Sequence, residues 1–202
     1  MKLNVLEMCL VNNPLRGWVQ ENFELRALKR LLSRDRFDAI LEIGCGNGVG
    51  TRLIDKHFGP RTLAAMDLDE RMVRMARDRY RDGPARFQVM DASRLGFADR
   101  SFDAVFDFGA IHHVPRWQRC LSELKRVLKP GGRLALEEFS IETFSGFPGA
   151  LWRRLLRHPY DRMFSTKQFV REAAAAGFRI DGFREINTLG ISRHFYLTAT
   201  AL

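Results

Sequence analysis

Short apolar runs and stretches of helical periodicity follow one another along most of the chain, which predicts alternating strands and helices. The apolar runs lie at residues 39–43, 63–66, 86–90, 102–108 and 133–139. The stretches in which apolar residues recur at helical spacing lie between them, at residues 49–58, 70–81 and 115–129. Alternation of this kind is typical of a mostly parallel sheet with helices on both faces.

The two ends of the chain depart from this alternation. Residues 3–32 show helical spacing in two pieces, divided near Pro14, because proline disfavours helix at the residue before it. Near the other end, residues 165–168 (STKQ) form a capping box, and the helix that they start ends at Gly177. Residues 178–186 and 194–200 then alternate as two strands joined by a short loop.

A run of glycines follows the first strand. Residues 41–50 read LEIGCGNGVG, which predicts a strand, a tight turn and a helix. In this arrangement a nucleotide-like ligand lies against bare backbone at the carboxyl end of the strand. The dinucleotide fingerprint requires a glycine where Val49 stands, which argues against a nicotinamide oxidoreductase. Glu42 suits a cationic amino-acid group better than a pyrophosphate.

Acidic residues follow the second and third strands. Asp67 lies about 20 residues beyond the glycine turn, where a carboxylate can accept hydrogen bonds from ribose hydroxyls. Asp69 is a candidate N-cap for the next helix. Asp91 ends the third strand, although aspartate is also a common turn residue.

These motifs together resemble those of the Rossmann-like methyltransferases that use S-adenosylmethionine. Residues 42–48 (EIGCGNG) resemble the first motif, residues 67–69 the second, and Asp91 with Ala92 the third. Residues 101–139, with HHV and RVLKPGG, resemble the branch that modifies quinones and other small molecules. The resemblance implies a doubly wound, mostly parallel α/β sheet closed by an antiparallel strand pair.

The resemblance also implies the cofactor and its site. S-adenosylmethionine is the expected cofactor, with Asp67 on the ribose and Asp91 on the adenine amine. The residues implied to bind it are Glu42, Gly44, Cys45, Gly46, Gly48, Asp67, Leu68, Asp91, Ala92 and Asp107. No metal site is expected, because the three cysteines are scattered without ligand spacing.

We predict one methyltransferase domain over residues 1–202. It comprises an N-terminal helical cap (1–36), a cofactor-binding core (37–139), and an acceptor-side insertion with the closing strands (140–202). In this family such caps often close over the cofactor or acceptor. Asn12, Arg16 and Trp18 are therefore candidate site residues, and packing on the sheet is the alternative.

A general base is needed only where the acceptor must lose a proton. The candidates cluster after the fourth and fifth strands, on the face where such sheets bind ligands. We expect His112, His113 and Glu138 to be the catalytic residues, with Asp107 and Glu137 as further candidates. Histidine titrates near neutrality, which suits proton removal. The alternatives are that the histidines only pack, and that the glutamate forms an ion pair with an arginine.

Charge and composition bear on the acceptor. The formal net charge of +9 and the pI of about 10.1 favour anionic partners, although much of the excess can be solvated helix surface. Residues 142–164 interleave aromatic residues with arginines. In this family the corresponding segment commonly lines the acceptor pocket. This predicts a small apolar or amphiphilic acceptor, quinone-like or lipid-like, with peripheral contact to an anionic membrane. A lid over a soluble metabolite is the alternative.

Two other function classes stay open at this point. The basic pI suggests an RNA methyltransferase, but the chain lacks the Asn/Asp-Pro-Pro-aromatic motif that holds a flipped base. A non-catalytic S-adenosylmethionine-binding protein would have the same motifs. The expected location is the cytoplasm, because no apolar run approaches the roughly 20 residues of a membrane span and the N-terminus does not read as a signal peptide. The oligomeric state is not predicted.

Overall fold

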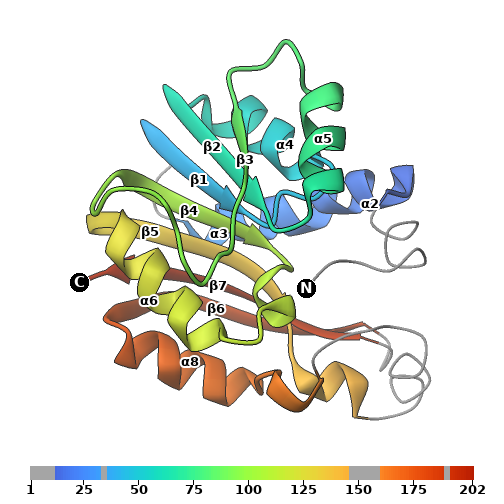
Figure 1. Ribbon diagram of the computed structural model, residues 1–202. Coiled ribbons are helices and arrows are strands. Elements are labelled where there is room, and N and C mark those ends of the chain that lie inside the picture. The colour runs from blue at the N-terminus through green and yellow to red at the C-terminus, as the bar shows by residue number, and fades with distance from the viewer. Residues whose placement is uncertain (1–11, 33–35, 146–159, 189–191) are drawn as a thin grey trace.

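Seven strands form one sheet in the computed structural model, which describes residues 12–32, 36–145, 160–188 and 192–202 (Figure 1). The strands lie in the order β3-β2-β1-β4-β5-β7-β6. Their bounds are β1 Ala39–Ile43, β2 Thr62–Asp67, β3 Arg86–Val89, β4 Phe102–Phe108, β5 Leu128–Phe139, β6 Phe178–Thr188 and β7 Ser192–Ala201. Strands β1 to β5 pair in parallel, and β7 pairs antiparallel with both β5 and β6. The predicted fold is confirmed.

Helices lie on both faces of this sheet. The α-helices after the N-terminal segment are α4 Val49–Phe58, α5 Glu70–Arg79, α6 Trp117–Val127 and α8 Thr166–Ala175. The 3-10 turns are η2 Ile111–His113, η3 Ile141–Phe144 and η4 Tyr160–Arg162. The N-terminal segment comprises α2 Pro14–Val19, the π-helical η1 Gln20–Leu25 and α3 Arg26–Leu31, which follow one another without a break. The first piece of the predicted cap lies outside the described residues.

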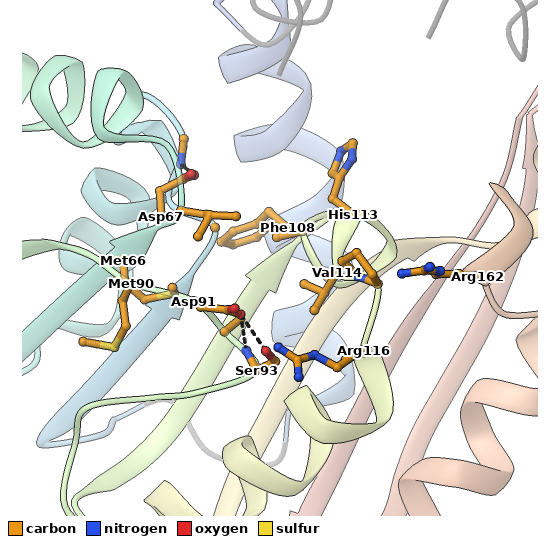
Figure 2. A pocket seen from close by; sticks show the side chains of 17 residues that line it. Met66, Asp67, Met90, Asp91, Ser93, Phe108, His113, Val114, Arg116 and Arg162 are labelled. Carbon is orange, nitrogen blue, oxygen red and sulfur yellow. Dashed lines mark hydrogen bonds between the residues drawn. The ribbon is translucent and has the colours of Figure 1, made fainter. Parts of the chain in front are cut away.

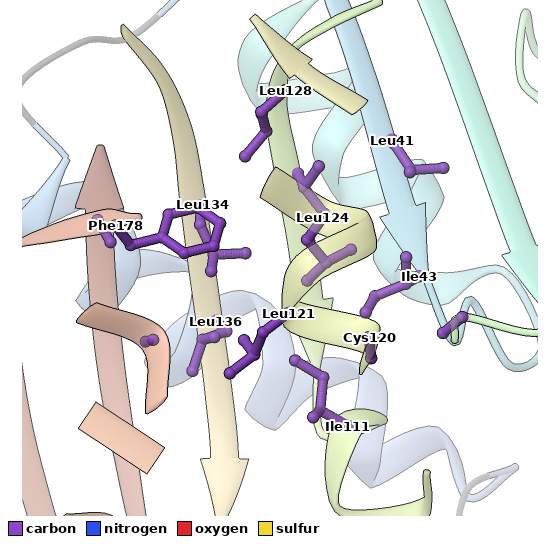
Figure 3. Packing of buried hydrophobic residues seen from close by; sticks show 14 of the residues in the cluster. Leu41, Ile43, Ile111, Cys120, Leu121, Leu124, Leu128, Leu134, Leu136 and Phe178 are labelled. Atoms are coloured by element: carbon purple, nitrogen blue, oxygen red, sulfur yellow. The ribbon is translucent and has the colours of Figure 1, made fainter. Parts of the chain in front are cut away.

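The core forms two main layers because successive strand residues point to opposite faces of the sheet. Leu41 and Ile43 of β1 join α6 and α8 in one cluster, whereas Ile40 joins α3 and α4 in the other. Figure 3 shows Leu121 and Leu124 of α6 lying over the sheet between β1 and β5. Both are fully buried. The near-continuous apolar strands therefore reflect burial on both faces, as parallel sheets require.

Two helices begin at the N-cap residues predicted for them, whereas a third does not begin at its predicted proline. The Asp69 side chain accepts a hydrogen bond from the Arg71 amide, and the Ser165 hydroxyl accepts one from the Gln168 amide. Both predicted N-caps are confirmed. Helix α6 begins at Trp117 rather than at Pro115, because Arg116 has a non-helical conformation (φ −111°, ψ 53°).

Strand β5 begins earlier than the predicted Arg133. Leu128 pairs with Phe102, and Arg133 pairs with Ala104, so the residues between them form a bulge against β4. The Lys-Pro-Gly-Gly segment that signals the end of a helix therefore lies inside the strand, with Gly131 at φ +77°. A bulge accommodates this left-handed residue without ending the strand.

The strand order places the site. The chain winds outward from β1 to β3 and then returns to β4 on the other side of β1. The connections that leave the neighbouring strands β1 and β4 therefore run in opposite directions along the sheet. They leave a crevice at the carboxyl ends of these two strands, where open α/β sheets bind ligands. None of the described helices is long and apolar enough to span a bilayer.

Candidate functional site

A cavity of about 530 Å³ opens at the carboxyl ends of β1 to β4, where the strand order reverses (Figure 2). This volume lies within the range of roughly 300–1,000 Å³ that is typical of small-molecule sites. The lining residues are Gly44, Gly46, Met66, Asp67, Leu68, Met90, Asp91, Ala92, Ser93, Phe108, Gly109, Ala110, His113, Val114, Pro115, Arg116 and Arg162.

The glycine turn forms one wall of the cavity with bare backbone. Gly44 has φ +61°, and a Cβ atom on it would lie 2.1 Å from the Cβ of Ala110. Gly48 serves a different purpose, because its Cβ would lie 3.0 Å from the Cβ of Ala76 on α5. Gly48 therefore permits close helix packing behind the turn and does not line the cavity, in contrast to Gly44 and Gly46.

Asp67 joins the glycine turn to the end of β2. Its Oδ2 accepts a hydrogen bond from the Gly46 amide (3.0 Å), and its Oδ1 accepts one from the Asp69 amide (2.8 Å). Burial raises the pKa of Asp67, although these two amides oppose the shift. A carboxylate oxygen has two lone pairs, so each oxygen keeps acceptor capacity toward the cavity.

Asp91 is the second acid on the wall. Its Oδ1 accepts hydrogen bonds from both the amide and the hydroxyl of Ser93, each at 2.8 Å (Figure 2). Burial works to raise the pKa of Asp91, but the Ser93 bonds and the charge of Arg116 outweigh it and hold that pKa below its usual value. Asp91 is therefore an anion at neutral pH.

Glu42 and Cys45 lie beneath the turn rather than on the wall. Glu42 is 2% exposed, and Thr51 donates its hydroxyl to the Glu42 carboxylate. Burial, with a smaller contribution from the neighbouring acids Asp107 and Asp67, raises the pKa of Glu42 to about 8, although the hydrogen bond from Thr51 opposes the shift. Cys45 is 5% exposed, and its amide donates to the Met66 carbonyl (2.9 Å). Both residues support the turn from behind.

The raised pKa of Glu42 predicts a pH-dependent stability. Folding favours the protonated carboxyl, so this contribution is complete below the ordinary pKa of 4.5 and is lost as the pH rises through about 8. We expect the melting temperature of Glu42→Gln, relative to that of the wild type, to be higher at pH 9 than at pH 5. Thermal unfolding at both pH values measures this. The exposed Glu70→Gln is the control and should track the wild type; an unchanged gap for Glu42→Gln would contradict the prediction.

Glu138, His112 and Asp107 form a buried network behind the cavity. Glu138 Oε2 lies 2.6 Å from His112 Nδ1, and Oε1 accepts hydrogen bonds from the amides of Ile111 and His112. Asp107 accepts from the Ala110 amide (2.9 Å). Burial raises the pKa of Glu138 to about 7, whereas burial and repulsion from Glu138 raise the pKa of Asp107 well above its ordinary value.

The structure places these three candidate residues behind the cavity wall. Glu138 and Asp107 are fully buried, His112 is 5% exposed, and none of the three lines the cavity. Glu138 pairs with His112. The network holds the turn that carries Ala110 and His113, and so shapes the wall.

His113 is the predicted candidate base that does reach the cavity. Its ring contacts that of His112 in a tilted arrangement at a centroid distance of 4.1 Å, and Figure 2 shows it near Phe108. The predicted site residues that the structure brings together are Gly44, Gly46, Asp67, Leu68, Asp91, Ala92 and His113.

The other candidates lie elsewhere or outside the described residues. The Asn47 side chain donates to Asn12 Oδ1 (2.6 Å), which ties the N-terminal segment to the glycine turn. Trp18 is 55% exposed and contacts Phe23 edge-on. The side chain of Arg16 and residues 146–159, most of the predicted acceptor segment, lie outside the described residues.

Sequence patterns missed much of the wall. Phe108, Val114 and Pro115 supply its apolar part, and Arg116 and Arg162 supply cations. The FGAIHHVPR run between β4 and α6 was the available signal for the first group. Nothing in the local pattern distinguishes Arg162 from its neighbouring arginines. Within the described residues, no cluster of histidine, cysteine and acidic side chains is arranged to hold a metal ion.

Comparisons with known proteins bear on the class of this domain. A family model described as a methyltransferase domain matches residues 41–136. A fatty-acid O-methyltransferase of Mycolicibacterium smegmatis is 38% identical over 93 residues, 46% of this chain and 34% of that protein. A probable phthiotriol/phenolphthiotriol dimycocerosates methyltransferase of Mycobacterium ulcerans is 38% identical over 96 residues, 48% of this chain and 37% of that protein. The chain thus spans about a third of the length of these relatives.

A solved structure extends the likeness beyond the matched core. An S-adenosylmethionine-dependent methyltransferase from Methanosarcina mazei superimposes with a TM-score of 0.68 at 27% identity, over 87% of this chain and 97% of that one. The family model, the glycine turn and the strand order all point to one class of domain. Residues 41–136 match a methyltransferase domain, and the chain shares the Rossmann-like fold of this S-adenosylmethionine-dependent methyltransferase over most of its length.

Proposed function

We propose that this protein transfers a methyl group from S-adenosylmethionine to a small apolar or amphiphilic acceptor. The observation that carries the proposal is the meeting of the glycine turn, Asp67 and Asp91 around one cavity. Gly44 and Gly46 would face the amino-acid part of the cofactor, Asp67 the ribose and Asp91 the adenine amine. The chemistry of this donor set fits the cofactor, because two acids and open backbone suit its hydroxyls and amines.

The bound cofactor would supply an electrophilic methyl group on its sulfonium. The task of the chain is then to orient the acceptor and exclude water, and orientation alone can contribute about 7–11 kcal/mol to catalysis at best. Phe108, Val114 and Pro115 form the apolar part of the wall, and Figure 2 shows Phe108 and Val114 on the side of the cavity away from Met66 and Met90. An apolar acceptor fits this side, in keeping with the names of the two mycobacterial relatives.

The test is methyl transfer itself. Purified protein is incubated with S-adenosylmethionine and four acceptor classes: medium-chain fatty acids, fatty alcohols, a short-chain quinol and bulk RNA. We expect release of S-adenosylhomocysteine with one of the first three. Release with RNA alone would support the RNA methyltransferase instead, and cofactor binding without release on any acceptor would support a binding protein.

We further propose that His113 removes the acceptor proton where the accepting group is a hydroxyl. Turnover should then rise with pH as histidine deprotonates near neutrality, and His113→Ala should lower turnover about a hundredfold or more. Binding of S-adenosylhomocysteine should not change. His57→Ala, on α4 and away from the wall, is the matched control. A rate that is flat in pH, with His113→Ala fully active, would leave His113 only a packing role.

Peripheral contact with an anionic membrane stays a proposal of its own. Support comes from the net charge of +9 and from the exposed Leu15, Trp18 and Phe23 on α2 and η1. Sedimentation with anionic and neutral vesicles at low salt tests it, and failure to bind the anionic vesicles would exclude it.

A further inference from the structure

We infer that Arg162 binds a carboxylate on the acceptor, so that the acceptor is an amphiphile with an acidic head and an apolar body. The inference rests on the proposed function and narrows its substrate class. It makes Arg162 a specificity-determining residue at the acceptor end of the cavity.

Arg162 belongs to the cavity although it comes from a distant part of the chain. It is the last residue of η4 and lines the same cavity as Asp67 and His113. Figure 2 shows its guanidinium beside Val114, on the side of His113 and across the cavity from Asp67. The arginine therefore lies at the end opposite the residues proposed to hold ribose and adenine.

Arg162 has no acidic partner among the described residues. Among the residues that the structure describes, no carboxylate lies within ion-pair distance of Arg162, whereas Arg126 is paired with Glu123 and Asp99. Arg116, the other arginine on the wall, acts on Asp91 and lowers its pKa. A guanidinium at the mouth of an apolar pocket, without an acid of its own, suits a planar anionic group.

A monoanion fits this end better than a phosphate. The wall carries two cations, Arg116 and Arg162, and two acids, Asp67 and Asp91. Because Arg116 acts on Asp91, Arg162 is, among the described residues of the wall, the arginine left for the acceptor, and one arginine balances one negative charge. Phe108, Val114 and Pro115 line the same cavity and suit an alkyl or aromatic body.

The competing role for Arg162 is to hold the carboxylate of the cofactor itself. The two roles make different predictions, because a cofactor contact affects S-adenosylhomocysteine binding and an acceptor contact does not. The experiment therefore measures binding of decanoate, 1-decanol and S-adenosylhomocysteine by calorimetry. The variants are Arg162→Gln, Arg162→Lys and, as the matched control, Arg171→Gln on the exposed surface of α8.

We expect wild-type protein to bind decanoate more tightly than 1-decanol. Arg162→Gln should weaken the binding of decanoate about tenfold to a hundredfold, because one charge-assisted hydrogen bond is lost. The binding of 1-decanol should stay unchanged. Arg162→Lys should keep part of the preference, because it keeps the charge and loses the planar fork. Arg171→Gln should match the wild type.

Several results would overturn the inference. The first is a wild-type protein that binds decanoate no more tightly than 1-decanol. The second is an Arg162→Gln variant that loses affinity for both compounds equally, and the third is one that loses affinity for S-adenosylhomocysteine. Decanoate and 1-decanol are measured with and without S-adenosylhomocysteine. Absence of cofactor binding by the wild type would thus contradict the proposed function, while the comparison of the two acceptors would still decide the role of Arg162.

Discussion

Replacement of Gly44 by alanine is expected to lower the free energy of unfolding by about 2–5 kcal/mol, from backbone strain together with overpacking. The glycine has φ +61°, which an L-residue adopts at a cost. Its new Cβ would also lie 2.1 Å from the Cβ of Ala110, and both atoms belong to backbone segments with little freedom to move. The cavity wall must therefore shift, and S-adenosylhomocysteine binding should be lost with it.

The chain offers a control that separates the two causes. Gly59 has φ +53°, and nothing lies within 4 Å of the position of its Cβ. Gly59→Ala should therefore show the strain alone, about 1–2 kcal/mol, and bind the cofactor normally. Chemical denaturation and calorimetry measure both variants. Equal effects of the two substitutions on stability and binding would show that contact between Gly44 and Ala110 does not shape the site.

Replacement of Asp67 by alanine is expected to weaken S-adenosylhomocysteine binding by about 1–3 kcal/mol, roughly fivefold to more than a hundredfold. The substitution removes the proposed acceptor of the ribose hydroxyls. It also releases the amides of Gly46 and Asp69, which the Asp67 carboxylate now holds at 3.0 and 2.8 Å. Loss of order in the glycine turn would add to the effect.

A second variant keeps this prediction decisive if Asp67→Ala is unstable. Asp67→Asn retains one carbonyl oxygen and the shape of the side chain, so it should fold and bind with an intermediate affinity. Asp78→Ala, on the exposed side of α5, controls for the loss of a negative charge. Calorimetry with S-adenosylhomocysteine compares all three. Wild-type affinity in Asp67→Ala would remove Asp67 from the site.

Local patterns predicted the elements and the strand-end residues well. Strand β4 has the predicted bounds, and the caps at Asp69 and Ser165 lie where the pattern placed them. Asp67 and Asp91 reach the cavity because parallel strands end at one edge, which follows from the order of elements alone. The end of a strand can be located from its apolar run. A polar residue that directly follows the run must then lie at the carboxyl-end edge of the sheet.

The direction in which a side chain points was less accessible to prediction. Glu138 and His112 have the residue types of a catalytic pair, but both side chains are buried behind the wall. The next residue along the chain, His113, lines the cavity instead. Gly48 looks like a further ligand glycine, and its role became visible only with Ala76 of α5 beside it. Arg162 reaches the wall through tertiary structure, which no spacing in its own segment encodes.

The attachment of the η2 turn to Glu138 links the cavity wall to the far half of the sheet. The turn follows β4, yet its amides are bound by a side chain of β5, and β5 pairs with β7 from Arg133 to Phe139. In that register Glu138 lies opposite Phe195. A substitution in the hairpin of β6 and β7 that moves β5 therefore also moves the turn that carries His113. The acceptor side of the cavity can thus be reshaped from the hairpin without any change in the glycine turn, Asp67 or Asp91.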